Sequence, residues 1–290
     1  MKKLIITVLI TGLSILAIKI GSIILKYSDD DYGAKQQTEA QDSLLAEVEK
    51  EQLTESLNAN CRLRLNLSED TLKFELKNST ESGEGYDAEF IYPKFSGESS
   101  GIHRLNKELE LLVFDELPDS KAYFSKYNQE YIEEFKGVNP AEKYNWSDLE
   151  EIELIINSKE IVSAIHHDFE LKSGGAIFFG KRIGVNFDIV NEKEITFEEL
   201  FDKTKSDILQ LALVNSYKDL FEVESLKENG WDKEEIPISE NFVLEEDGIT
   251  FIYQRFQYSG VSGGGMDLKV FYCQLMDLIK GDSKIKEKLK

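Results

Sequence analysis

Apolar and polar side chains alternate along several stretches of this sequence, which is the pattern of half-buried β-strands. The alternation covers residues 61–67 and returns over residues 72–77 after the turn at Ser68-Glu69-Asp70. These two stretches are predicted to pair as a hairpin. A third strand is expected near residues 89–92 and is predicted to end at Pro93.

Apolar residues at a spacing of three or four predict helices in the next part of the chain. The predicted helix faces are Ile102, Leu105, Leu109, Leu112 and Val113 in the first helix, and Tyr123, Tyr127, Tyr131 and Phe135 in the second. A longer helix is expected over residues 202–224, with Ile208, Leu211, Ala212 and Asn215 on one face. Further strands are predicted near residues 149–156, 160–171, 176–190, 241–244, 249–258 and 268–272. Strands in runs and helices in separate blocks predict an α+β fold with mostly antiparallel sheets and packed helices.

The amino terminus has a different pattern. Leu4 to Leu25 is a run of 22 residues interrupted by one charge, Lys19. At about 1.5 Å per helical residue, such a run can cross about 30 Å of hydrocarbon. The position pairs after the run fit a signal-peptidase site poorly, so an uncleaved transmembrane helix is expected before the folded body, with cleavage as the alternative. Lys2 and Lys3 place the amino terminus in the cytoplasm and the body outside it.

These patterns divide the chain into segments. They are a membrane anchor or signal segment (1–26), a polar juxtamembrane helix or stalk (27–58), a folded body (59–282, with halves at about 60–170 and 171–282) and a basic tail (283–290). The tail is expected to be solvated and frayed.

Composition changes this picture in one respect, the charge. The chain has 34 basic and 55 acidic residues, for a formal net charge of −21. Such a body repels phosphate backbones, which argues against a nucleic-acid partner, and it attracts cationic partners. The two cysteines, Cys61 and Cys273, could pair in an oxidising compartment and join the first strand to the last, or they could be two buried free thiols.

Four stretches between about Phe90 and Lys280 resemble the RsiV-like extracytoplasmic domain, catalogued as domain-of-unknown-function families 4163 and 3298. They are Phe90–Pro93, residues 161–176, residues 185–201 and residues 242–275. Relatives in that family include anti-sigma factors that bind lysozyme and appendages to peptidoglycan deacetylases. The resemblance implies an envelope binding or sensing module and does not imply catalysis. This sequence departs from the family at Ile177, where a histidine is common, and over 255–262, which lacks the family's proline.

Candidate catalytic and metal-binding patterns are weak. Gly260-Val-Ser262-Gly-Gly264 matches G-x-S-x-G, but no histidine follows it to complete a hydrolase triad. On the strand over 161–171, alternation places His166, Asp168 and Glu170 on one face and His167 on the other. That row is interpreted as a structural polar face, with a metal site as the less favoured alternative, and His167 as a hydrogen-bonded core residue.

The sequence therefore predicts a membrane-anchored, non-enzymatic binding or sensing domain in the bacterial envelope, with its body outside the cytoplasm. No catalytic residue, metal or cofactor is predicted, and the expected partners are the membrane, through residues 4–25, and a cationic protein or envelope polymer. The alternative is an envelope polysaccharide or peptidoglycan hydrolase, or an accessory module of one, with paired carboxylates as acid and base. Binding is expected at a Gly-rich loop after an aromatic strand, through Arg255, Tyr258, Gly263, Gly264 and Gly265.

Overall fold

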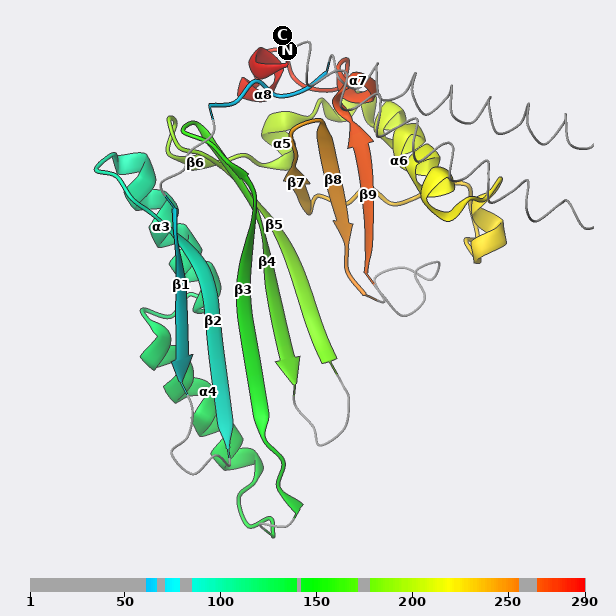
Figure 1. Ribbon diagram of the computed structural model, residues 1–290. Helices are drawn as coiled ribbons and strands as arrows, with labels where there is room; N and C mark the ends of the chain where they lie inside the picture. Colours follow the sequence, from blue (N-terminus) through cyan, green and yellow to red (C-terminus); the bar gives the residue numbers. More distant parts are fainter. Residues whose placement is uncertain are drawn as a thin grey trace, which may run out of the picture. The chain divides into compact units, whose positions relative to one another are not determined.

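The described residues form two β-sheets, and the larger contains six strands in chain order (Figure 1). They are β1 (Thr71–Asn78), β2 (Tyr86–Phe95), β3 (Trp146–Asn157), β4 (Ile161–Leu171), β5 (Phe178–Asp188) and β6 (Lys193–Glu194). Neighbouring strands are antiparallel except β2 and β3, which are parallel. A parallel pair requires a long crossover connection. Here the crossover carries the helices α3 (Ser100–Val113) and α4 (Ser120–Glu134), which cover one face of the sheet.

The structure is a computed structural model that describes residues 61–66, 71–78, 85–139, 142–171, 178–255 and 265–289. The predicted anchor (4–25) and stalk (27–58) lie outside these residues. Within the described ranges, no helix is long and apolar enough to span a membrane. All of the described residues belong to a single unit that extends over 57–290.

Side-chain caps fix the start of both crossover helices. Ser99 accepts a hydrogen bond from the backbone N–H of Ile102 at the start of α3, and Asp119 accepts two at the start of α4. The buried face of α3 is made by Leu105, Leu109 and Val113, as its spacing predicts. The two helices pack on the sheet through an aromatic-rich core that includes Phe90, Phe114 and Tyr123.

The smaller sheet has three antiparallel strands, β7 (Phe242–Leu244), β8 (Gly248–Tyr253) and β9 (Met266–Phe271). Helix α6 (Ser206–Phe221) packs on β9. The remaining short helices are α5 (Phe197–Leu200), η2 (Lys203–Lys205), η3 (Leu226–Asn229), α7 (Tyr272–Leu275) and α8 (Lys284–Lys288). This second half has its own hydrophobic core, and the overall class is α+β as predicted.

The two sheets meet where β5 passes β7. A side chain at Gly184 would place its Cβ 2.0 Å from the carbonyl oxygen of Phe242, so only glycine fits there. The side-chain amide of Asn186 donates to the same carbonyl oxygen at 2.8 Å, and its Oδ1 accepts from the N–H of Leu244 at 2.8 Å. Asn241 bridges back with bonds to the N–H of Gly184 and the carbonyl of Arg182. The side-chain amides of Asn186 and Asn241 therefore make the hydrogen bonds between the two sheets that backbone groups make within a sheet.

Three expectations for the strands are wrong. Residues 61–66 do not form a strand of either sheet. Leu63 is buried between exposed neighbours. Its backbone N–H donates to the carbonyl oxygen of Glu246, and the backbone N–H of Arg64 donates to the carbonyl oxygen of Lys288. The predicted hairpin is replaced by the pairing of β1 with β2. Strand β2 also continues through Pro93 to Phe95. Proline is tolerated because the pairing with β3 ends at Ile91, so the ladder on that side needs no donor from it.

Two expectations for the helices are also wrong. The buried residues of α6 are Leu209, Ala212, Leu213, Val214 and Tyr217, whereas Ile208 and Leu211 are exposed. The basic tail is not frayed over its helical part. Helix α8 buries Ile285, and the ammonium of Lys284 lies 2.8 Å from the buried carboxylate of Asp188.

The sulfur atoms of Cys61 and Cys273 form a disulfide, with Cα atoms 5.4 Å apart. The bond fastens the start of the described chain to α7 across 212 positions of sequence. The sequence leaves open whether Cys61 and Cys273 pair or stay free thiols, and in the structure they are paired.

Replacing both cysteines by serine should lower the free energy of unfolding by about 4 kcal/mol, because the long loop would regain its entropy in the unfolded chain. Urea unfolding of the oxidised protein and of the Cys61→Ser/Cys273→Ser variant measures the difference. Adding a reductant to the native protein should reproduce the loss and should leave the variant unchanged. Equal unfolding midpoints in all four samples would contradict the prediction.

Candidate functional site

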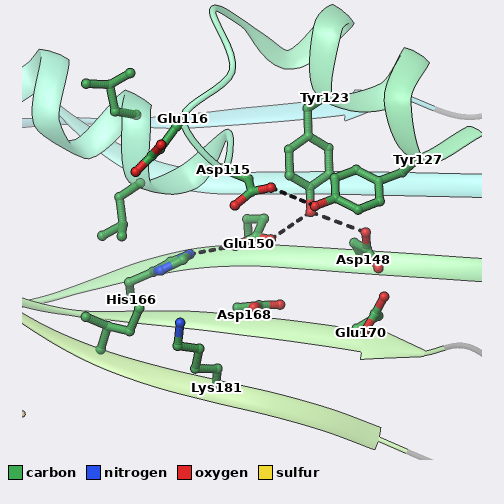
Figure 2. Close-up of a pocket in the computed structure, with 13 residues that line it drawn as sticks. Asp115, Glu116, Tyr123, Tyr127, Asp148, Glu150, His166, Asp168, Glu170 and Lys181 are labelled. Atoms are coloured by element: carbon green, nitrogen blue, oxygen red, sulfur yellow. Dashed lines mark hydrogen bonds and ion pairs between the residues drawn. The ribbon is translucent and has the colours of Figure 1, made fainter.

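An open pocket of about 300 Å³ lies between the α3–α4 turn and the face of β3, β4 and β5 that these helices cover (Figure 2). Six of its thirteen lining residues carry carboxyl groups: Asp115, Glu116, Asp148, Glu150, Asp168 and Glu170. His166 and Lys181 are the basic groups on its wall. The pocket is thus strongly acidic.

The floor of the pocket follows from strand alternation and register. On β3, Asp148 and Glu150 occupy alternate positions that face the helices, between the buried side chains of Trp146 and Ile152. Asp148 is directly opposite Glu170 on β4, and Glu150 is directly opposite Asp168. Like charges in directly opposed positions destabilise a sheet. Two such pairs side by side, partly buried, favour a functional explanation over a structural one.

Tyrosine hydroxyls supply part of the hydrogen bonding that the buried carboxylates need. The hydroxyl of Tyr86 donates to Oδ2 of Asp148 at 2.5 Å. The hydroxyl of Tyr123 lies 3.2 Å from the same oxygen and 2.9 Å from Oε1 of Glu150, and its one proton can serve only one of them at a time. Nε2 of His166 is 2.6 Å from Oε2 of Glu150.

This network is incomplete. Among the described residues, Oδ1 of Asp148 and Nδ1 of His166 have no hydrogen-bond partner, although both side chains are more than nine-tenths buried. A buried acceptor without a donor is destabilising, and a ligand that supplies the donor removes that penalty. The pocket therefore contains an acceptor that is oriented for a group the protein itself does not provide.

The rim of the pocket is formed by the turn between α3 and α4. Asp115 and Glu116 both have positive φ angles, 48° and 60°, a conformation that is uncommon for residues other than glycine. Oδ2 of Asp115 accepts bonds from the ammonium of Lys126 at 3.0 Å and the hydroxyl of Tyr127 at 2.9 Å. The bond from Lys126 is the main reason that the pKa of Asp115 lies below its usual value. Asp115 on the rim thus stays ionised, while Asp148 and Glu150 on the floor are shielded from solvent.

Two of the floor carboxyl groups, those of Asp148 and Asp168, have pKa values raised toward neutral pH. Burial, together with the charges of Glu170 and Glu150, raises the pKa of Asp148 to about 7 against the hydrogen bond from Tyr86. Burial and the charge of Glu150 likewise raise the pKa of Asp168 to about 6. Burial and the same carboxylates raise the pKa of Tyr123, which keeps its hydroxyl a proton donor. The pocket can therefore exchange protons for a cation close to neutral pH.

The donor set does not fit a metal ion. In the described part of the chain, no three His, Cys, Asp or Glu side chains are placed to hold one ion. The pocket also has apolar walls, from Leu111 and Leu112 on α3 and from Ile183 on β5. Oxygen-seeking ions such as Ca²⁺ require six to eight oxygen ligands. An organic cation with an apolar portion fits this mixed lining better.

The binding residues expected from the sequence lie elsewhere or are not described. Arg255 follows the end of β8, and Gly265 precedes β9, where a Cβ would lie 2.9 Å from the carbonyl oxygen of Tyr253. Neither residue lines the pocket. Tyr258, Gly263 and Gly264 lie outside the described residues, so binding at this loop stays a prediction.

The polar row on β4 is confirmed, because His166, Asp168 and Glu170 share the face that lines the pocket. The assignment of the core histidine is wrong. His166 is the buried one, whereas His167 is half-buried, lies 3.2 Å from Glu153 and stacks on Phe169. Sequence reasoning missed Asp148, since the strand was expected to begin at Leu149, and it gave Glu150 no role although that residue lies inside the predicted strand. A start at Trp146 would have placed both carboxylates on the helix-covered face.

Replacing Asp148 by asparagine should stabilise the protein in a pH-dependent way. In the folded protein the carboxyl group of Asp148 keeps its proton up to about pH 7, whereas in the unfolded chain it keeps it only to about pH 4. The free energy of unfolding therefore falls as the pH rises between these two values. Asp148→Asn should raise the free energy of unfolding by about 1–3 kcal/mol at pH 8 and by much less at pH 4.5. Urea unfolding at both pH values checks this, with the exposed Glu130→Gln on α4 as the matched charge control. The same gain at both pH values would count against a raised pKa.

No family model matches the sequence, and no curated protein matches it. Solved structures do resemble the fold. A member of the DUF3298 family from Bacteroides fragilis aligns with a TM-score of 0.60 and 18% identity, over 78% of this chain and 99% of its own. A DUF3298 family protein from Pseudomonas aeruginosa aligns with a TM-score of 0.57 and 14% identity, over 73% of this chain and 94% of its own. These similarities support the 3298 part of the resemblance, while the RsiV-like assignment and family 4163 stay predictions. The chain has the fold of DUF3298 structures.

Proposed function

We propose that this protein is a membrane-anchored, extracytoplasmic binding or sensing domain without enzymatic activity, and that its ligand places a positively charged group in the acidic pocket. The observation that carries the proposal is the opposed carboxyl pairs of β3 and β4, with a buried Oδ1 of Asp148 that lacks a donor among the described residues. The net charge of −21 supports a cationic partner, either a protein or an envelope polymer, because it attracts such partners over a distance.

The proposed location rests on two separate features. The apolar run Leu4–Leu25 follows two lysines, which is typical of an anchor that leaves the body outside the cytoplasm. The disulfide between Cys61 and Cys273 supports the same side of the membrane, because disulfides persist in oxidising compartments. The resemblance to the RsiV-like domain, which implies envelope binding or sensing, agrees with both.

A second candidate function is hydrolysis of an envelope polysaccharide. One observation favours it: the raised pKa of Asp148, about 7, suits a general acid near neutral pH. A glycosidase also requires a second carboxylate as base or nucleophile, and Glu150 and Asp168 are neighbours of Asp148. Binding is the preferred function because a cationic ligand would do two things at once. It would supply the hydrogen-bond donor that Oδ1 of Asp148 lacks, and it would neutralise part of the negative charge of the pocket.

Removing two floor carboxylates should abolish capture of the partner. Detergent-solubilised full-length protein would be immobilised and exposed to envelope extract. We expect the native protein to retain a cationic component that 0.5 M NaCl elutes, because screening weakens charge pairing. Asp148→Asn/Asp168→Asn should retain about tenfold less, and Glu130→Gln/Glu133→Gln, which removes two exposed carboxylates of α4, should retain the native amount. Equal capture by both variants would contradict the proposal. Polymer cleavage that the floor variant loses would instead support the hydrolase.

Capture should also weaken as the pH falls. Below about pH 6 both Asp148 and Asp168 hold protons, so the floor loses two of the negative charges that attract a cation. Affinity for the purified partner should drop about tenfold or more between pH 8 and pH 5. Binding at pH 6.5 should also release protons from the floor. Calorimetry in two buffers of different ionisation enthalpy measures this release. Constant affinity over this range would place the cation outside the floor.

A further inference from the structure

Lys181 is the one lysine among the described residues that line the pocket. It lies on β5 directly opposite Asp168 of β4, and Figure 2 shows its side chain on the same side of the sheet as the carboxyl groups. Lys181 is exposed. Within the described part of the chain, no hydrogen bond or ion pair joins its ammonium to another residue. The lysine thus sits at the mouth of the pocket without a fixed partner.

The influence of Lys181 reaches two sides of the pocket. Burial raises the pKa of Asp168, and the ammonium of Lys181 acts against that rise. The same ammonium adds to the main effect of Lys126 in lowering the pKa of Asp115 on the rim. Lys181 is therefore close enough to influence charges on both the floor and the rim.

We infer that the pocket binds an alkylammonium or guanidinium group on an aliphatic stem, such as a lysine or arginine side chain of a partner. This inference rests on the proposed function. It includes a role for the ammonium of Lys181, which competes with the ligand for the negative charge of the floor. Lys181 is a tethered competitor, whose positive charge at the mouth opposes the entry of a second cation. It balances part of the floor's charge while the pocket is empty.

The walls of the pocket match such a stem. Leu111, Leu112 and Ile183 supply apolar surface beside the carboxyl groups. The rings of Tyr123 and Tyr127 line the same space, and a cation is attracted to an aromatic face. Lys126 already stacks on Tyr127, with its ammonium 4.5 Å from the ring centre, and therefore shows that this ring accepts a cation. The charged head would reach Oδ1 of Asp148, the buried acceptor that lacks a donor.

The competition predicts that removing Lys181 strengthens binding. The probe is a tetralysine peptide with blocked ends, titrated into detergent-solubilised full-length protein at pH 8 and low salt. Lys181→Met should bind the peptide about three- to tenfold more tightly than the native protein, because the ligand no longer displaces an internal cation. Lys107→Met, which removes one exposed charge from the outer face of α3, should change affinity by less than about twofold.

Three further measurements decide between explanations. A tetra(N-acetyl-lysine) peptide, which lacks the charge, should not bind. Asp148→Asn/Lys181→Met should lose the gain that Lys181→Met shows. CaCl₂ is titrated alone, and tighter binding of Ca²⁺ than of the peptide would overturn the organic-cation assignment. Thermal unfolding of each variant confirms that it is folded.

The outcomes separate this inference from the proposed function. If Lys181→Met leaves peptide affinity unchanged or weakens it while Asp148→Asn/Asp168→Asn abolishes capture of the partner, the competitor role is wrong and the proposed function stands. If neither variant alters any binding, both are wrong. If native protein and Lys181→Met both ignore the peptide at millimolar concentration, the ligand class is wrong.

Discussion

The parallel pairing of β2 with β3 is the constraint on which the rest of the structure depends. It forces the chain to leave the sheet after β2 and to return beside it in the same direction, and α3 and α4 fill that crossover. The helices then cover the face on which Asp148 and Glu150 project, and they bring the hydroxyl of Tyr123 over both carboxylates. Without the crossover, these strand positions would face water and would be ordinary surface charges.

The second sheet fixes the pocket from the opposite face. Successive residues of β5 point in opposite directions, so Lys181 lines the pocket while Arg182 makes a bidentate ion pair with Asp267 of β9, at 2.7 and 2.8 Å. Two positions further along, the close approach at Gly184 and the amide bonds of Asn186 attach the same strand to β7. The strand that carries the exposed lysine is therefore itself held firmly. Lys181 can move as a side chain without any movement of the wall.

The local elements of the fold were readable from the sequence, and its long-range pairings were not. Alternation on β4 placed His166, Asp168 and Glu170 on one face correctly, because that pattern depends only on the strand. The predicted hairpin of 61–67 with 72–77 failed because β1 pairs with β2. Strand β2 in turn pairs with β3 at positions 60 residues apart, such as Tyr86 with Trp146, which local patterning does not reveal. The buried face of α6 was also missed, since Leu211 is as apolar as Leu213 and only the position of β9 decides which is covered. The pocket required β3 to begin at Trp146, before the apolar pattern becomes clear.

Three ways of neutralising the floor compete in this pocket, and the competition connects the fold to the proposed function. Four carboxyl groups opposed across β3 and β4 cannot all be ionised without a large electrostatic penalty, so protons, the ammonium of Lys181 and an incoming cation each relieve part of it. Because the three act on one set of charges, they are thermodynamically linked, and each must weaken the others. A domain built this way gains affinity for a cation without a rigid cage of ligands. It also gains a dependence on pH, which suits the extracytoplasmic location that we propose for the body.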